Sequence, residues 1–441
     1  MFPYWTFLKA ILESKKVDKM TREQLQALQQ AKLRKLVAYA MDNCPFYADL
    51  YAKAGIKKEN VASIRITDLP IVNKQILMAN FAKVVTDPRL KYDELQKYIS
   101  EDHDPAHNYL GVYKIMHTSG TSGVPAIYPY HMKEVATVIA RMLDRVEPVT
   151  FKNIFWKRRM AWYAAMHGHF AGVTYLAAAP KLMMKVKTIS ILDPVSKVVE
   201  ALNKFQPDDL SGYASSMEIL AQEKREGRLR IHPQRITCGG DVLTDHRRNE
   251  IRDAFGINPA NSYSLTEGFG VANQVFGYPH LTVFDDLYLL EVEPKTRMTN
   301  LYNYTFPILR YENDDVIRVV RHPMYEQDPF TQIEMIEGRD IDSLNIVNNN
   351  GEKDSIHSAP LVEFFVPGIE KFQFFERPFN TILIRVAGKG GSLKSDVQLA
   401  MLKILKEKNA EKSVILEIET VDDIAVDPKT GKFKLVNQMG K

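Results

Sequence analysis

The chain has 441 residues, of which 45% are hydrophobic and 25% are charged. These are values of a globular protein long enough for two or three hydrophobic cores. The net charge of +4 is too small to indicate a nucleic-acid partner, and two cysteines, Cys44 and Cys238, form no disulfide framework. No apolar run of about 18 residues predicts a membrane span, and the N-terminus lacks the pattern of a signal peptide. We therefore expect a cytoplasmic protein.

The first predicted helix begins after Thr21, because Thr21-Arg22-Glu23-Gln24 has the spacing of a capping box. Leucines repeat at helical spacing from Leu25 onward, and Asn43-Cys44-Pro45 ends the pattern. We expect this helix to serve packing, within a mostly helical entry region over residues 1–100.

A loop of two glycines and four hydroxyl side chains follows at residues 117–125, His-Thr-Ser-Gly-Thr-Ser-Gly-Val-Pro. The apolar runs 113–116 and 126–130 predict a short strand on each side of it. Glycine lets backbone N–H groups approach a ligand, and hydroxyls add small donors, which suits a triphosphate. Val124 follows the last glycine, so the loop is not a Walker loop, and an ordinary surface turn is the alternative.

Helical and extended patterns alternate between residues 130 and 260. We predict helices over residues 135–146, 192–205, 216–226 and from Thr244, and strands over residues 161–166 and 235–239. This alternation is typical of parallel α/β layers, and Gly239 and Gly240 stand at a strand end, where such sheets bind ligands. The basic run 157–159 is interpreted as a solvated surface.

The stretch from Asn261 to Gly268 combines an aromatic ring, a hydroxyl and a carboxylate, in Tyr263, Thr266 and Glu267. A carboxylate holds Mg²⁺ well when phosphate oxygens share the ion. Beyond residue 342 the pattern changes to a hairpin, two strands, a helix over residues 397–405 and a further strand. We expect a compact α+β unit of about a hundred residues there.

These motifs resemble, in the same order, those of the adenylate-forming ligases, in particular the phenylacetate–CoA ligase and CapK-like branch. The resemblance runs from about residue 20 to residue 436. It implies a large layered α/β adenylation domain over residues 1–338 and a smaller mobile α+β lid over residues 339–441. The chain departs from the family at Val124, where many members have lysine, and at residues 312–314.

The resemblance also implies roles for individual residues. For the nucleotide these are phosphate contacts from Ser119, Gly120, Thr121, Ser122 and Gly123; an adenine pocket lined by Gly239, Gly240 and Asp241; stacking on adenine by Tyr263; and contact of Thr266 with the α-phosphate. Glu267 would hold Mg²⁺, Asp315 (or alternatively Asp314) would bind the ribose, and Arg339 would bind nucleotide oxygens. Asp342 would be the hinge, and Lys432 (or alternatively Lys434) would be the catalytic lysine. His169 and Phe170 would form an acyl pocket or gate; the alternative is that His169 is a histidine satisfied in a core turn.

The function that follows is ATP-dependent activation of a small carboxylic acid, with AMP and pyrophosphate as products. Coenzyme A is the expected acceptor in this branch. An adenylating amide ligase acting on an amino sugar or amino acid is one alternative, and a non-catalytic nucleotide-binding protein is another. A homodimer is compatible with the branch, and the sequence does not name the acid.

Overall fold

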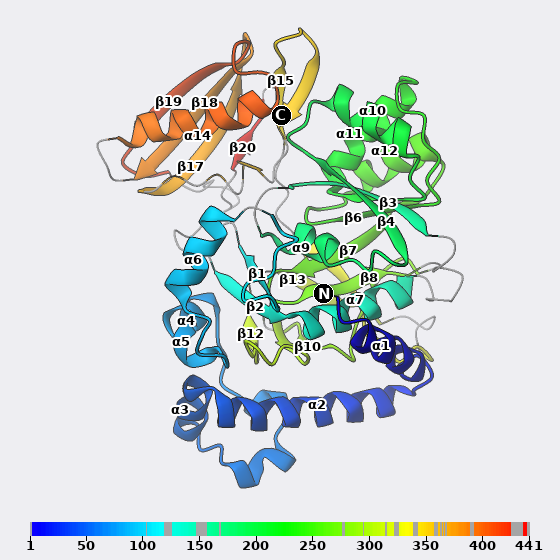
Figure 1. The fold of residues 1–441 in the computed structure, drawn as a ribbon, viewed down its shortest axis with the longest axis vertical. Coiled ribbons are helices and arrows are strands. Elements are labelled where there is room, and N and C mark those ends of the chain that lie inside the picture. Colours follow the sequence, from blue (N-terminus) through cyan, green and yellow to red (C-terminus); the bar gives the residue numbers. More distant parts are fainter. Residues whose placement is uncertain are drawn as a thin grey trace.

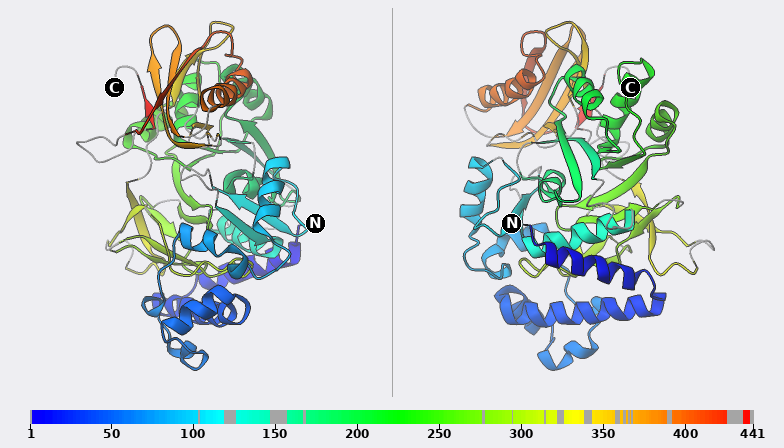
Figure 2. Two further views of the ribbon diagram at one scale, coloured as in Figure 1. Left: turned by 90° about the vertical axis from the view of Figure 1, so that its left-hand side faces the viewer. Right: turned by 45° about the vertical axis from the view of Figure 1, so that its right-hand side comes forward.

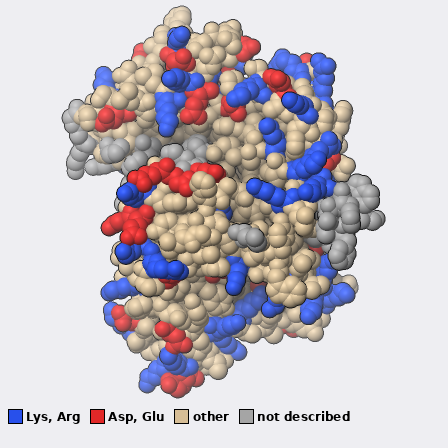
Figure 3. Space-filling model, viewed as in Figure 1, with Lys and Arg blue, Asp and Glu red and all other residues tan. Residues whose placement is uncertain are grey.

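The computed structural model describes residues 2–102, 104–118, 126–146, 157–166, 169–275, 278–293, 295–313, 315–321, 326–337, 343–356, 360–361, 364, 366, 368–388, 392–424 and 435–438. Figures 1 and 2 show a mixed α/β protein. Within these residues, no helix combines the length and the apolar character needed to cross a membrane. Acidic and basic side chains both occur on the face drawn in Figure 3, as expected from the small net charge.

Helices make up most of the first hundred residues, as the sequence predicts. They are α1 (Tyr4–Val17), α2 (Arg22–Asn43), α3 (Pro45–Lys53), α4 (Lys74–Ala79), α5 (Phe81–Val84) and α6 (Tyr92–Glu101). The predicted capping box is confirmed: the Gln24 amide N–H donates to Thr21 Oγ1, and the Thr21 amide N–H donates to Gln24 Oε1 at 2.9 Å. This reciprocal bonding satisfies two donors that a helix N-terminus otherwise leaves without partners.

A nine-stranded sheet forms the centre of the molecule, in the order β13-β14-β9-β8-β7-β6-β5-β3-β4. Its strands are β3 (Arg158–Ala164), β4 (Met184–Ser190), β5 (Asp209–Gly212), β6 (Arg235–Gly239), β7 (Ala260–Leu265), β8 (Phe269–Gln274), β9 (Leu281–Val283), β13 (Val316–Val319) and β14 (Gln332–Glu337). Strands β3 to β7 are parallel, and the others continue the sheet in antiparallel pairs. The predicted parallel α/β layers are therefore confirmed.

The parallel strands have one face in a hydrophobic core and the other beside a cavity. Alternate side chains, such as Tyr163, Leu210 and Ile236, pack in a core with helices α10 (Val195–Phe205), α11 (Ala214–Arg225) and α12 (Asp245–Phe255). Successive side chains of a strand point to opposite faces, so the residues between them face α7 (Met132–Val146) and α9 (Ala171–Ala177). On that face, side chains of β3, β5 and β6 line a cavity.

Two small sheets lie beside the central one. Strands β1 (Tyr113–His117) and β2 (Ile127–His131) form an antiparallel pair that confirms the strands predicted around the glycine-rich loop. Strands β10 (Tyr288–Glu291), β11 (Arg297–Asn300) and β12 (Tyr311–Glu312) form the other. Both sheets contribute to the largest core, together with the N-terminal helices and α7.

The C-terminal part has a hydrophobic core of its own, whose buried members run from Leu344 to Val436. Its elements are β15 (Leu344–Val347), β16 (Lys353–Ile356), β17 (Ile369–Arg377), β18 (Thr381–Gly388), α14 (Leu393–Glu407), β19 (Ile415–Val421) and β20 (Val436–Asn437). The hairpin, the helix and the strands predicted here are confirmed. The predicted boundary at residues 338 and 339 and the hinge at Asp342 lie outside the described residues, so the division into two domains stays a prediction.

Candidate functional site

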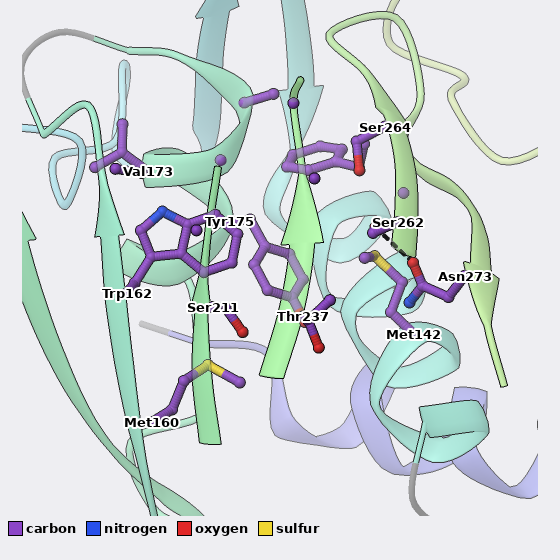
Figure 4. Close-up of a pocket in the computed structure, with 18 of the residues that line it drawn as sticks. Met142, Met160, Trp162, Val173, Tyr175, Ser211, Thr237, Ser262, Ser264 and Asn273 are labelled. Carbon is purple, nitrogen blue, oxygen red and sulfur yellow. Dashed lines mark hydrogen bonds between the residues drawn. The ribbon is translucent and has the colours of Figure 1, made fainter. Parts of the chain in front are cut away.

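Two cavities meet beside the carboxyl end of β7. The first, here called the apolar cavity, has a volume of about 350 Å³ and lies between the sheet and helices α7 and α9 (Figure 4). The second, here called the adjoining cavity, has a volume of about 550 Å³ and follows the turn after β6. The cavities share four lining residues, namely Gly240, Ser262, Ser264 and Leu265. Open α/β sheets bind ligands at the carboxyl ends of their strands, so one ligand lying across this junction would occupy the expected place.

The turn after β6 depends on glycine. Gly240 has φ of +82°, and a Cβ atom on it would lie 2.7 Å from a ring carbon of Tyr213. Both the backbone angle and the close approach exclude an ordinary side chain. The predicted residues Gly239 and Gly240 both line the apolar cavity, and Gly240 lines the adjoining cavity as well.

Asp241 lines the adjoining cavity, but both of its carboxylate oxygens also bind the start of α11. The Ala214 amide N–H donates to Oδ1, and the Ser215 amide N–H donates to Oδ2 at 3.1 Å. A carboxylate is favoured at a helix N-terminus because it satisfies free N–H groups and faces the positive end of the helix dipole. Burial raises the pKa of Asp241, and the hydrogen bonds from Ser215 oppose that rise. Asp241 therefore fixes the glycine turn against α11.

Tyr263 and Asp315, which the resemblance assigns to adenine and ribose, are brought together in the adjoining cavity. The Tyr263 hydroxyl donates to Asp315 Oδ2 at 2.7 Å, although the residues are 52 positions apart in the chain. Burial, followed by the charge of Asp315, raises the pKa of Tyr263, so its hydroxyl stays protonated and remains a donor. The Thr296 hydroxyl donates to the Asp315 carbonyl at 2.6 Å and holds the backbone of that turn.

Glu267 lies at the junction between β7 and β8 and is buried with 7% of its surface exposed. Its Oε1 accepts from the Tyr311 hydroxyl at 2.7 Å and from the Tyr128 hydroxyl at 3.1 Å. The neighbouring Thr266 lines the apolar cavity, and its carbonyl accepts from the Tyr130 hydroxyl at 3.3 Å. Tyrosines of β2 and β12 thus fix both residues of the predicted Thr-Glu motif.

Glu267 could hold a magnesium ion only together with ligands that the described protein side chains do not supply. Among the described residues, no group of three or more His, Cys, Asp or Glu side chains is arranged to hold a metal ion. Mg²⁺ commonly takes one or two carboxylates and completes its shell with phosphate oxygens and water. Within the part of the chain that the structure describes, both hydrogen bonds of the Glu267 carboxylate fall on Oε1 and leave Oε2 for such a role.

The two residues predicted for the acyl pocket lie in different surroundings. Phe170 lines the apolar cavity. His169 lines neither cavity and is fully buried, with its Nε2 at 2.6 Å from the Asp102 carbonyl and its ring 5.0 Å from that of Tyr98. His169 is therefore the core histidine of the alternative interpretation, and the prediction that its side chain lines the pocket is wrong.

The remaining predicted site residues lie outside the described part of the chain. These are Ser119, Gly120, Thr121, Ser122, Gly123, Asp314, Arg339, Asp342, Lys432 and Lys434. The residue that precedes the glycine-rich segment on β1, His117, is described: its amide N–H donates to the His169 carbonyl at 3.2 Å, and its ring lies 4.3 Å from that of Phe170. The base of the loop is therefore held beside a residue that lines the apolar cavity.

The end of the apolar cavity farthest from the glycine turn carries charge. Arg158 Nε and Nη2 donate to the two oxygens of Asp209 at 2.7 and 2.9 Å, and Arg235 Nε donates to Asp209 Oδ1 at 2.8 Å. All three residues line the cavity. The prediction that the basic run 157–159 is a solvated surface is thus wrong for Arg158, whereas Lys157 is exposed and Arg159 pairs with Asp208 at the surface.

Comparisons with known proteins find distant relatives, several of which are ligases. No family model matches it. It is 22% identical over 411 residues to Protein CapK of Staphylococcus aureus, covering 84% of this chain and 80% of that protein. It is 26% identical over 331 residues to a phenylacetate–coenzyme A ligase of Thermus thermophilus, covering 68% of this chain and 67% of that protein. The chain is a homologue of both.

The fold agrees with this relationship. A solved structure of 2-hydroxyisobutyryl-CoA ligase, in complex with 2-HIB-AMP and CoA, superposes with a TM-score of 0.62 and 16% sequence identity, covering 96% of this chain and 91% of that one. The chain therefore has the fold of that ligase.

Sequence patterns do not reveal several residues of this CapK homologue that define its cavities. Trp162, Ser211 and Thr237 lie side by side on neighbouring strands, and Met142 projects from α7 beside them (Figure 4). The alternation along each strand indicates which residues share a face, but it does not tell which face meets a cavity. The tyrosines around Glu267 do carry a signal, since Tyr128 lies in the apolar run 126–130 after the glycine-rich loop and Tyr311 directly precedes residues 312–314.

Proposed function

We propose that the protein is an ATP-dependent carboxylic acid ligase that forms an acyl-adenylate and transfers the acyl group to coenzyme A. The observation that carries this proposal is the meeting of two cavities at Gly240 and at Ser262, Ser264 and Leu265. An acyl-adenylate joins an acid to a nucleotide, so its two halves fit two cavities that touch where the bond between them lies. Homology to the phenylacetate–coenzyme A ligases supports the same chemistry.

The adjoining cavity is proposed to hold the adenosine. The Tyr263 ring offers an aromatic face to the purine, and the hydroxyl is fixed by Asp315. Asp315 Oδ2 accepts the hydrogen bond from that tyrosine, and its Oδ1 is proposed to accept from the ribose hydroxyls. Asp241 then acts mainly by holding the turn that lines this cavity, because the N-terminus of α11 uses both of its oxygens.

The phosphates are proposed to lie between the junction of the cavities and the glycine-rich loop. Glu267 would hold Mg²⁺, which supplies positive charge to the phosphate oxygens when bound. Thr266 and residues 119–123 would donate hydrogen bonds to the same oxygens. The two tyrosine hydroxyls on Oε1 keep the Glu267 carboxylate in one orientation and so prepare it for a ligand on its other oxygen.

The apolar cavity is proposed to hold the acid, with its carboxylate at the junction. A carboxylate is already a nucleophile, so the reaction needs no serine or cysteine activated by histidine. A carboxylate oxygen forms a bond to the α-phosphorus, and the bond from that phosphorus to the bridging oxygen breaks. Pyrophosphate leaves with the electron pair. The coenzyme A thiol then loses its proton, its sulfur attacks the acyl carbon, and AMP leaves with the electrons of the broken C–O bond.

Residues 339–441 are proposed to act as a lid that turns about Asp342. A separate hydrophobic core in this part of the chain supports the proposal. Lys432 would stabilise charge that develops on the carboxylate and α-phosphate oxygens, with Lys434 as the alternative, and Arg339 would bind nucleotide oxygens. A lid that excludes water protects the hydrolysable mixed anhydride from loss.

The test is ATP–pyrophosphate exchange in the presence of Mg²⁺ over a panel of aromatic, fatty and amino acids. The proposal predicts exchange with a subset of the acids and formation of AMP and pyrophosphate. Release of ADP and orthophosphate would instead indicate acyl-phosphate chemistry and would refute the proposal. Lack of exchange with every acid would favour a non-catalytic nucleotide-binding protein. Trapping of the product by a thiol or by an amine then separates coenzyme A transfer from amide formation.

A further inference from the structure

Two hydroxyl side chains lie next to each other on the strand side of the apolar cavity. Ser211 of β5 pairs in register with Trp162 of β3 on one side and with Thr237 of β6 on the other. Residues that pair in register on parallel strands point to the same face, and all three side chains line the cavity (Figure 4). Neighbouring strands are about 4.8 Å apart, so one ligand atom between Ser211 and Thr237 can reach both hydroxyls. These two groups are here called the hydroxyl pair.

The hydroxyl pair has no hydrogen-bond partner among the described residues. Ser211 is buried, with 5% of its surface exposed, and within the described part of the chain neither hydroxyl makes a hydrogen bond. The Ser262 hydroxyl lines the same cavity and differs in this respect, because it donates to Asn273 Oδ1 at 2.6 Å. The large majority of buried polar side-chain atoms have a partner. Two hydroxyls that have none and open on a cavity therefore indicate a partner that enters the cavity.

The wall opposite the strands is built mainly from apolar and aromatic side chains. They come from α7, α9 and the residues near them, and they include Met142, Leu143, Phe170, Val173, Tyr175 and Phe269. A volume of about 350 Å³ is within the range of small-ligand pockets. A ligand that fills it would place apolar or aromatic surface against this wall and would turn a polar group towards the hydroxyl pair.

The register of β6 fixes the distance between the hydroxyl pair and the reacting end of a ligand. Thr237 precedes Gly239, the last residue of β6, by two positions and Gly240 by three. At about 3.3 Å per residue, the pair lies about 7–10 Å along the strands from the glycine turn, where the reacting carboxylate is proposed to lie. A benzene ring joined to the carboxylate by a short carbon chain spans that length.

We propose that the acid activated here carries a hydroxyl group on an otherwise apolar or aromatic body, and that Ser211 and Thr237 recognise this hydroxyl. The inference rests on the proposed function for the identity of the reacting end. Serine and threonine hydroxyls both donate and accept, so a ligand hydroxyl between them donates to one and accepts from the other. An acid with a methyl group at that position leaves both protein hydroxyls buried without partners, and it is the poorer substrate for that reason.

The test uses pairs of acids that differ only in a para hydroxyl or a para methyl group, which are nearly equal in size. The pairs are the para-substituted phenylacetates, 3-phenylpropanoates and 4-phenylbutanoates, so the distance from the carboxylate to the substituent varies from pair to pair. In ATP–pyrophosphate exchange, kcat/KM for the hydroxyl acid is expected to exceed that for the methyl acid by about 10- to 100-fold in the pair whose length fits. Equal values of kcat/KM within every pair would overturn the inference.

Removal of the hydroxyl pair should remove the preference. Thr237→Val keeps the shape of the side chain without its hydroxyl, and Ser211→Ala removes the neighbouring hydroxyl. In the double variant, the ratio of the two kcat/KM values is expected to fall to about one or below. The value for the methyl acid is expected to rise, because its methyl group then meets an apolar floor. Thr237→Ser keeps the hydroxyl and is expected to retain most of the preference, whereas a preference that survives in the double variant would overturn the assignment to these residues.

The matched control is Thr188→Val. Thr188 of β4 pairs in register with Trp162, so it stands at the same level of the sheet as the hydroxyl pair, but it is exposed and lines neither cavity. Neither acid of a pair should change its kcat/KM in this variant. An equal loss of preference in Thr188→Val and Thr237→Val would overturn the assignment, because it would show a general effect on the strands.

Binding of the same acids, measured by calorimetry, separates failure of this inference from failure of the proposed function. Tighter binding of the hydroxyl acid that disappears in the double variant, without any exchange, would support the inference and contradict the ligase. Exchange without a preference for the hydroxyl acid would overturn the inference and support the ligase. An absence of both exchange and preferential binding with every pair would overturn the inference, and the wider panel of acids would then decide on the ligase.

Discussion

Replacing Glu267 by glutamine tests the metal assignment with little disturbance of the fold. The amide Oε1 of glutamine still accepts from Tyr128 and Tyr311, which now bind the carboxylate at 3.1 and 2.7 Å. Each bond becomes a neutral one and weakens by about 1 kcal/mol, and the lower cost of burying a neutral group offsets part of that loss. We therefore expect the free energy of unfolding to change by less than about 2 kcal/mol.

Activity should change far more than stability in Glu267→Gln. Loss of one pre-positioned charge stabiliser typically costs about 10²–10³ in rate. The expected result is a fall of that size in ATP–pyrophosphate exchange, with a requirement for more Mg²⁺, while denaturant unfolding stays nearly unchanged. Tyr311→Phe is the matched control, because it removes the 2.7 Å hydrogen bond and keeps the charge of the Glu267 carboxylate. Its activity should fall by about tenfold or less, which corresponds to the loss of one such hydrogen bond. Near-normal exchange by Glu267→Gln at limiting Mg²⁺ would refute the assignment and direct attention to Asp241 or Asp315.

Two further predictions concern the lid and the buried charges. Lys432→Ala should slow acyl-adenylate formation by about 10²–10³ and leave the rate of thioester formation from supplied acyl-adenylate within a few-fold. Lys434→Ala should slow neither half-reaction. Equal losses in both half-reactions for Lys432→Ala would contradict a lid that alternates. Burial raises the pKa of Asp286, but Arg145 and Arg141 together outweigh it and lower that pKa to about 2. The stability from Asp286, about 2 kcal/mol, is therefore present above about pH 4 and lost as the pH falls towards 2. The gap in unfolding free energy between wild type and Asp286→Asn should shrink over that interval, and a constant gap would contradict the pairing.

Local signals account for the parts of the structure that the sequence predicts well. The capping box at Thr21 and the N-cap at Thr244 each act within a few residues, so the pattern and the structure share one cause. The Tyr263–Asp315 contact is non-local, and the sequence does not predict it: the resemblance gives the two residues separate roles, adenine for Tyr263 and ribose for Asp315.

Non-local packing accounts for what the sequence does not predict. Arg158 stands in a basic run that is typical of surfaces, and its pairing with Asp209 depends on two parallel strands that only the fold brings together. His169 is the opposite case, because the sequence assigns it to a pocket and the structure places it in the core. Its place in a turn of glycine and aromatic residues resembles a pocket, yet the Asp102 carbonyl and the Tyr98 ring surround it in the core.

The C-terminal unit contains a buried ion pair, Lys408 with Asp354, and each member also hydrogen-bonds the backbone at the start of α10. Lys408 Nζ lies 3.2 Å from Asp354 Oδ1 and donates to the Asp193 carbonyl at 3.1 Å, while the Val195 amide N–H donates to Asp354 Oδ2 at 3.4 Å. Asp354 thus binds the first residue of α10 from across the contact. Both side chains are only 1% exposed, so a rotation of the lid would return two charges to water.

The free energy of transferring these two charges to water is close to zero, because a buried ion pair gains little over two hydrated charges. The pair therefore orients the C-terminal unit without holding it strongly, which is compatible with the proposed lid. Lys408→Met leaves Asp354 buried without its cation, at a cost of about 3–5 kcal/mol, and should favour the undocked arrangement. Lys408→Met combined with Asp354→Leu should instead favour docking. Hydrogen exchange at the Val195 amide should therefore be faster than in wild type in the single variant and should return towards the wild-type rate or below it in the double variant. Unchanged exchange in the single variant would mean that this ion pair does not govern docking.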